Sequence, residues 1–144
     1  MEFVVAYDGT PLSEAALKRA GELADAPAAV TAITIVPQQN GSWARKRDWL
    51  GPDESFDLER VRVAIERAVH KTLPEARLEM ETVGKHAPPG TIGTELRKLA
   101  AEVDPDVVAV GSDNAGRVVD GLGSAASSVT TDDRYDMLIV RRPA

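Results

Sequence analysis

Two short polar stretches follow apolar runs in this sequence, and the second contains glycines that could form a cradle for a phosphate. Asp8-Gly9-Thr10 follows FVVAY, and GSDNAGRVVDGLGS, from Gly111 to Ser124, follows DVVAV. Glycine lets backbone N–H groups approach a ligand closely because it has no side chain. Gly123-Ser124-Ala125 would add the unpaired N–H groups and the dipole of a helix N-terminus, which favour an anion. Because glycine spacing alone is a weak signal, a phosphate cradle and a plain strand-to-helix connection both remain open.

Other nucleotide-binding and catalytic patterns do not fit the sequence. No Gly-Lys-Ser/Thr of a Walker loop is present, and the glycines do not follow the first strand as a dinucleotide fingerprint requires. No nucleophile has a histidine and an acid at a recognisable spacing. The chain has no cysteine, which excludes disulfides and thiolate metal sites. We therefore expect a binding protein and not an enzyme.

Strand-like and helix-like segments alternate along the whole chain. The pattern predicts five strands, over residues 2–7, 29–37, 76–84, 106–111 and 136–142, and four helices, over residues 11–24, 53–73, about 92–100 and 124–131. This alternation predicts one α/β domain, residues 1–144, with a doubly wound parallel sheet and helices on both of its faces. Polar residues alternate through 76–84, which indicates an edge strand, whereas 106–111 is apolar enough to be central.

This organisation predicts where a ligand would bind. In open parallel sheets, ligands bind beyond the carboxyl ends of the strands, at the point where the strand order reverses. The Asp8 turn and the stretch beginning at Gly111 would meet at that crevice if the first and fourth strands are neighbours.

The charge and hydropathy of the chain narrow the class of partner. The formal net charge is −6, which argues against a nucleic-acid surface, since such surfaces need clustered Lys and Arg. The acidity fits ordinary solubility or adaptation to a salty cytoplasm, and charge alone does not separate the two. No apolar run approaches the roughly 20 residues that span a bilayer. We expect a cytoplasmic protein with no membrane partner.

Both ends of the chain resemble one known family. FVVAYDGTPLSEAALKRAGELA resembles the opening strand, turn and first helix of the universal stress protein family, and DPDVVAVGSDNAGRVVDGLGSAASSVTTDDRYDMLIVRR resembles its closing segment. The resemblance implies a flavodoxin-like sheet of the adenine nucleotide alpha hydrolase type, with strand order 3-2-1-4-5. Many members bind ATP or AMP through Gly-x-x-Gly followed, after an interval, by Gly-Ser/Thr. This chain matches at Gly111 and Gly123-Ser124, has Asn114 at the second glycine with Gly116 nearby, and has an interval one residue shorter.

The resemblance also implies roles for individual residues. Asp8 would hydrogen-bond the ribose and Ile35 would meet the adenine, while Gly123, Ser124 and Ala125 would hold the phosphates, with any Mg²⁺ arriving on the nucleotide. The complete set implied for nucleotide binding is Ala6, Tyr7, Asp8, Ile35, Gly111, Ser112, Asn114, Gly116, Gly123, Ser124 and Ala125.

The function implied is a small stress-response module that senses ATP or AMP as a homodimer and acts on a downstream protein, with at most slow ATP hydrolysis. Its dimer would form through the last strand, Met137 to Val140, because an apolar edge strand needs a cover. The alternative is a nucleotide-free interaction module whose glycine loop has degenerated.

Residues 38–52 hold both tryptophans and the cluster Arg45-Lys46-Arg47. We expect this segment to cover the sheet edge with two aromatic anchors, and an anion or partner site is its alternative.

Overall fold

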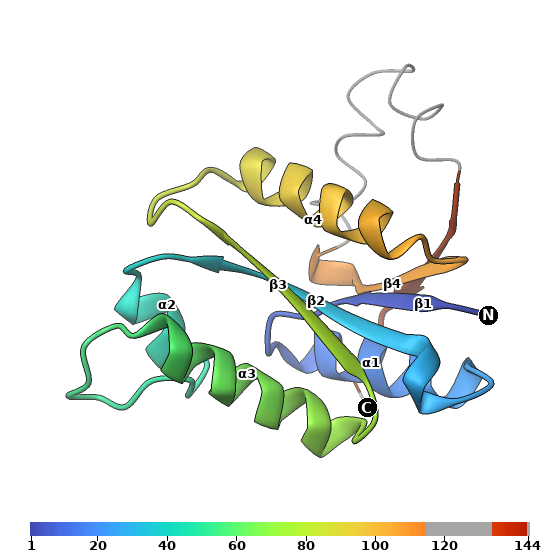
Figure 1. Cartoon of the computed structure of the whole chain (residues 1–144), viewed down its shortest axis with the longest axis horizontal. Helices are drawn as coiled ribbons and strands as arrows, with labels where there is room; N and C mark the ends of the chain where they lie inside the picture. The colour runs from blue at the N-terminus through green and yellow to red at the C-terminus, as the bar shows by residue number, and fades with distance from the viewer. Residues whose placement is uncertain (115–133, 144) are drawn as a thin grey trace.

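The fold is the predicted parallel sheet with helices on both faces (Figure 1). The computed structural model describes residues 1–114 and 134–143. Within them, five parallel strands lie in the order β3-β2-β1-β4-β5. The strands are β1 (Phe3–Ala6), β2 (Val30–Pro37), β3 (Arg77–Val83), β4 (Val107–Gly111) and β5 (Asp136–Val140). The helices are α1 (Pro11–Leu23), a short 3₁₀ turn at Pro27–Ala29, α2 (Gly41–Lys46), α3 (Leu58–Thr72) and α4 (Pro89–Val103).

Burial follows the strand positions that the sequence predicts. Every residue of β1 and β2 is buried, as expected for central strands covered on both faces. Exposed and partly buried residues alternate along β3, which confirms that it is an edge strand. β4 lies beside β1, so the polar turns that leave these two strands start at the same edge of the sheet.

The two faces of the sheet carry separate cores. Phe3 and Val5 of β1 belong to the core shared with α1 and α3, whereas Val4 and Ala6 belong to the core shared with α4. Figure 1 shows α1 and α3 together below the sheet and α4 above it. This alternation follows from the two-residue period of a strand.

The start of α1 is fixed by its own sequence. The Thr10 side chain accepts a hydrogen bond from the Ser13 N–H at 3.3 Å, and Pro11 occupies the first turn, where its missing N–H costs nothing. Ala15, Ala16 and Ala20 are buried and let the helix lie close to the sheet. The turn after β1 therefore passes directly into a capped helix.

Predicted boundaries of α3, α4 and β5 were wrong, and α4 begins at Pro89, three residues before the predicted start at Ile92. The helix expected from residue 53 begins at Leu58, because Asp57 caps it by accepting hydrogen bonds from the Glu59 and Arg60 N–H groups. Phe56, whose spacing suggested an earlier start, packs against the core from outside the helix. The last strand ends at Val140, two residues before the predicted end. The helix predicted over residues 124–131 lies outside the described residues.

Candidate functional site

The turn after β1 holds Asp8 in a fixed geometry. The Asp8 Oδ1 atom accepts hydrogen bonds from the Thr10 N–H at 3.1 Å and from the Thr10 hydroxyl at 2.6 Å. Gly9 has φ +80, a left-handed conformation that favours glycine, and a Cβ there would lie 2.7 Å from the Trp49 ring. The half-buried carboxylate is thus positioned by its own turn, and the Trp49 indole packs against that turn at Gly9.

The Asp8 carboxyl is held in its charged form. Burial alone would raise its pKa, but hydrogen bonds from the side chains of Thr10, Asn114 and Ser13 and from the Thr10 backbone outweigh burial and lower the pKa. Asn114 is 5% exposed and comes from the residues that follow β4. At neutral pH the group is an anion that accepts hydrogen bonds.

A small cavity lies beside this carboxylate. We call it the Asp8 cavity; its volume is about 170 Å³, and it lies at the carboxyl ends of β1 and β2, next to the start of the segment after β4. Five of the predicted site residues line it, namely Ala6, Tyr7, Asp8, Ile35 and Asn114. In a sheet of order 3-2-1-4-5 the strand order reverses between β1 and β4, so the cavity lies at the switch point.

The backbone of Ile35 faces this region. The Tyr7 N–H donates to the Ile33 carbonyl at 2.9 Å, so the backbone groups of Ile33 face β1. Residues two apart in a strand present their backbone groups to the same side, and β1 ends at Ala6. The Ile35 amide and carbonyl therefore lie beyond the end of β1, facing the Asp8 cavity.

Other predicted residues lie elsewhere. Gly111 is buried at the end of β4, where a Cβ would lie 2.7 Å from the Leu12 Cβ and 3.0 Å from the Leu12 carbonyl carbon. Glycine is therefore needed there for α1 to approach β4. Ser112 is exposed, and neither it nor Gly111 lines the Asp8 cavity. Gly116, Gly123, Ser124 and Ala125 lie outside the described residues.

Among the other lining residues, which sequence reasoning did not assign to the site, are Trp43, Arg47 and Lys85. The Arg47 Nε–H donates to the Asp8 carbonyl at 2.8 Å and its Nη1–H to the Trp43 carbonyl at 3.0 Å. Its guanidinium carbon lies 4.4 Å from the centre of the Trp43 ring. The basic cluster with its neighbouring tryptophan was the available signal, but its long-range contact with Asp8 depends on how the segment folds back.

The tryptophans cover a different place from the one predicted. The Trp49 ring stacks on Tyr7 with centroids 6.1 Å apart and meets Trp43 edge-on at 5.4 Å. Tyr7 follows the central strand β1, so the pair covers the exit of that strand and not a sheet edge. The prediction of an edge cover is corrected, because α2 turns the segment inward over the turn at Asp8.

The Tyr7 hydroxyl is held in place by polar contacts on the side away from the Asp8 cavity. Its hydroxyl donates to the Glu14 Oε1 atom at 2.6 Å, and the Thr72 hydroxyl donates to Oε2 at 2.6 Å. Burial, reinforced by the Glu14 carboxylate, raises the pKa of Tyr7. The contacts join the end of β1 to α1 and α3, which stiffens one wall of the site.

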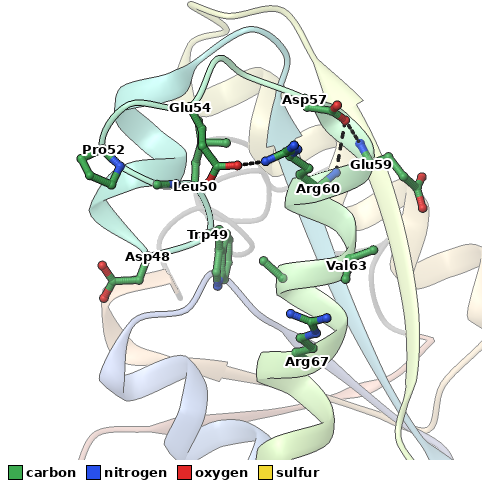
Figure 2. A pocket seen from close by; sticks show the side chains of 12 residues that line it. Asp48, Trp49, Leu50, Pro52, Glu54, Asp57, Glu59, Arg60, Val63 and Arg67 are labelled. Carbon is green, nitrogen blue, oxygen red and sulfur yellow. Dashed lines mark hydrogen bonds and ion pairs between the residues drawn. The ribbon is translucent and has the colours of Figure 1, made fainter.

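A larger cavity lies outside the predicted site. It has a volume of about 620 Å³, lies between residues 48–54 and α3, and is lined by Arg67 among others, so we call it the Arg67 cavity (Figure 2). None of the predicted site residues lines it. The smaller Asp8 cavity, by contrast, has the buried polar groups and the position at the switch point.

The described residues contain neither a metal-binding cluster nor a membrane-spanning helix. Across residues 1–114 and 134–143, no cluster of three or more His, Cys, Asp or Glu side chains is placed to hold a metal ion. No helix in this part of the chain is long and apolar enough to cross a membrane.

One family model matches nearly the whole chain. The model of the family described as "Universal stress protein family" matches residues 1–141. The chain belongs to the universal stress protein family. Among solved structures, this universal stress protein is similar to a hypothetical protein whose biochemical function was assigned from its structure. The two share 18% identity with a TM-score of 0.53, over 99% of this chain and 96% of the other. That similarity supports the fold.

A second similar structure is a universal stress protein in complex with cAMP. It shares 25% identity over 98% of this chain and 96% of the other, with a TM-score of 0.45. A comparison with curated proteins finds no match.

Proposed function

We propose that this universal stress protein binds an adenine nucleotide, ATP or AMP, in the Asp8 cavity and acts as a regulatory module without turnover. One observation carries the proposal: the cavity at the switch point gathers the Asp8 carboxylate, Asn114 and the strand residue Ile35. These are residues that the family resemblance assigns to the nucleotide.

The chemistry of Asp8 suits a ribose. A carboxylate offers about four acceptor positions. Thr10 supplies two hydrogen bonds and Asn114 and Ser13 supply one each, so a ribose hydroxyl would take the place of one of these donors. The lowered pKa keeps this group charged and able to accept that hydrogen bond at neutral pH.

The remaining lining suits a base and phosphates. Ile35, Ile92 and Leu96 provide apolar surface for a planar ring, and the Ile35 backbone faces the cavity to read the edge of the base. Arg47 and Lys85 bring positive charge that complements phosphate oxygens. The phosphate contacts expected from Gly123, Ser124 and Ala125 belong to the part of the chain outside the described residues, and Mg²⁺ would accompany the phosphates.

A second candidate function is a nucleotide-free interaction module. The Asp8 cavity, at about 170 Å³, is smaller than the roughly 300–1,000 Å³ typical of ligand pockets. Asn114, at the position of the family's second glycine, also forms a hydrogen bond with the Asp8 carboxylate and so uses one of its acceptor positions. In this case the cavity is a structural remnant, and the partner is a protein.

The first experiment is to denature freshly purified protein and identify any released nucleotide by chromatography and mass. Calorimetric titration with ATP and AMP follows. Asp8→Ala should abolish binding, whereas Asp113→Ala, which alters an exposed acid outside the cavity, should leave it intact. An empty protein that takes up neither nucleotide would favour the nucleotide-free module.

We also propose a homodimer formed through β5, in which nucleotide binding alters the affinity for a downstream protein. β5 ends the sheet, and Ile139 is 42% exposed on it. An exposed apolar edge strand needs a partner, and a second copy related by a two-fold axis supplies one. Ile139→Lys should give monomers in light scattering while nucleotide binding persists. A variant that stays dimeric would place the interface elsewhere.

A further inference from the structure

The Arg67 cavity has the dimensions and floor of a small-molecule site. Its volume of about 620 Å³ falls within the roughly 300–1,000 Å³ of ligand pockets. On the side formed by residues 48–54, the side chains of Trp49 and Leu50 line the cavity, and each is 6% exposed. The helix side contributes Val63 and Ala64. This apolar floor suits a flat hydrophobic body.

Each end of the cavity wall that α3 forms carries an arginine, Arg60 or Arg67. Arg60, Val63, Ala64 and Arg67 are spaced so that they share one face of α3. Arg60 and Arg67, seven residues apart, are separated by about 10 Å along the helix axis. Figure 2 shows them at opposite ends of the cavity.

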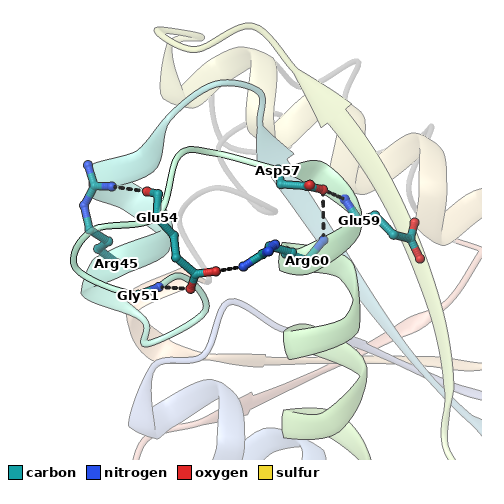
Figure 3. A network of polar contacts seen from close by, with 6 residues as sticks. All are labelled: Arg45, Gly51, Glu54, Asp57, Glu59 and Arg60. Carbon is teal, nitrogen blue, oxygen red and sulfur yellow. Dashed lines mark hydrogen bonds and ion pairs between the residues drawn. The ribbon is translucent and has the colours of Figure 1, made fainter.

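The Arg60 end is already neutralised within the protein. Arg60 forms an ion pair with Glu54, whose other carboxylate oxygen accepts a hydrogen bond from the Gly51 N–H at 2.7 Å (Figure 3). The Arg45 guanidinium donates to the Glu54 carbonyl at 3.2 Å, and Asp57 caps α3. This network pairs the Arg60 guanidinium within the protein at that end of the cavity.

The Arg67 end lacks a counter-charge. Arg67 makes no hydrogen bond or ion pair with any residue that the structure describes. The two remaining acids of the lining, Asp48 and Glu59, point away from the space between Trp49 and α3 (Figure 2). The interior therefore offers one guanidinium beside an apolar floor.

We propose that the Arg67 cavity binds a small amphipathic organic anion. A flat aromatic or alicyclic body lies against Trp49, Val63 and Ala64, and one carboxylate or sulfonate receives hydrogen bonds from Arg67, whose planar fork suits such groups. The site is separate from the Asp8 cavity and does not depend on nucleotide binding.

The test uses 8-anilinonaphthalene-1-sulfonate as the anionic probe and N-phenyl-1-naphthylamine, which has the same rings without the sulfonate, as its neutral match. Calorimetric and fluorescence titrations of the full chain should give one probe per chain. Arg67→Gln should weaken sulfonate binding about tenfold, since a hydrogen bond to a charged group is lost. The neutral compound should bind wild type weakly and be insensitive to this substitution.

Two control variants locate the probe. Arg62→Gln removes an exposed arginine of α3 that faces Glu59, and Lys85→Gln removes a cation that lines the Asp8 cavity. Neither should change the affinity for the probe. Energy transfer from Trp49 should persist in a Trp43→Phe variant, where Trp49 is the remaining tryptophan. The proposal is overturned by absence of probe binding, by an unchanged Arg67→Gln affinity, by equal losses in Arg62→Gln, or by a loss in Lys85→Gln instead.

Discussion

The two cavities of this protein meet at one indole but are built differently. Trp49 lines the Arg67 cavity, and its ring contacts Tyr7 and Trp43, which line the Asp8 cavity. The Asp8 cavity lies where strands end, so the sheet topology places it. The Arg67 cavity lies between a loop and a helix, so its shape depends on the packing of residues 48–54 against α3.

The polar groups of the two cavities also differ in whether other side chains hold them in place. Asp8 is held by Thr10 and Asn114 and is charged through these contacts. Arg67 is exposed and keeps its charge without any local partner among the described residues. A site built on strand ends thus has a preorganised acceptor, whereas the loop-and-helix site has an unneutralised donor. Substitutions that separate these features test the comparison.

The largest effect is expected from Trp49→Ala, which removes a wall of the Arg67 cavity and the ring on which Tyr7 and Trp43 pack. The indole is 6% exposed and packs on Tyr7 and Trp43, so its loss should lower the free energy of unfolding by about 3–5 kcal/mol. Urea denaturation measures this, with the half-buried Trp43→Ala as a control that should cost clearly less. Equal losses in the two variants would mean that Trp49 is not the common support.

An intermediate effect is expected from Asp8→Asn, and it should depend on pH. Because the folded pKa of Asp8 is lowered, its ionised contacts stabilise the fold above the unfolded pKa of about 3.9. This stability is lost as the pH falls through the folded pKa. Asp8→Asn should cost about 1.5–3 kcal/mol at pH 7, since hydrogen bonds to a charged group are weakened.

Urea midpoints of wild type and Asp8→Asn between pH 7 and pH 2 measure this dependence, and the difference between the two proteins should shrink below about pH 4. Arg67→Gln is the matched comparison from the other cavity: its unfolding free energy relative to wild type should not change over this range, because arginine does not titrate there. A difference for Asp8→Asn that is constant with pH would argue against a charged Asp8 in the folded state.

The smallest effect is expected from Asn114→Gly, which restores the glycine of the family pattern. Removing the amide frees an acceptor position on Asp8 and enlarges the Asp8 cavity, so ATP should bind about threefold to tenfold more tightly, equivalent to one net hydrogen bond. Calorimetry with ATP measures the change, and titration with the naphthalene sulfonate should give an unchanged affinity. Weaker ATP binding would show that Asn114 assists the ligand.

Much of the fold could be predicted from the sequence because periodicity and burial agree. The apolar run at β4 and the alternation in β3 identified a central and an edge strand correctly. The order of the strands followed from the family resemblance and was confirmed. The start of α3 was missed because the cap at Asp57 overrides an apolar spacing that extends to Phe56.

The site was predictable where it depends on strand ends. Asp8 directly follows an apolar run, whereas Ile35 was implied by the family resemblance, and both residues line the Asp8 cavity. The role of Gly111 in helix packing was not predictable, because it depends on Leu12 approaching from α1. The contact between Arg47 and Asp8 and the whole Arg67 cavity require the folding of residues 38–54, whose sequence has no regular period.

The close packing of Trp49 over Gly9 ties together two segments that are far apart in sequence. A side chain at position 9 would lie 2.7 Å from the indole, and the left-handed backbone there favours glycine as well. Neither position can be redesigned alone: enlarging residue 9 demands a smaller residue at 49, and shrinking residue 49 leaves a void beside the turn at Asp8. Directed evolution that changes one of these two residues should therefore select a compensating change at the other.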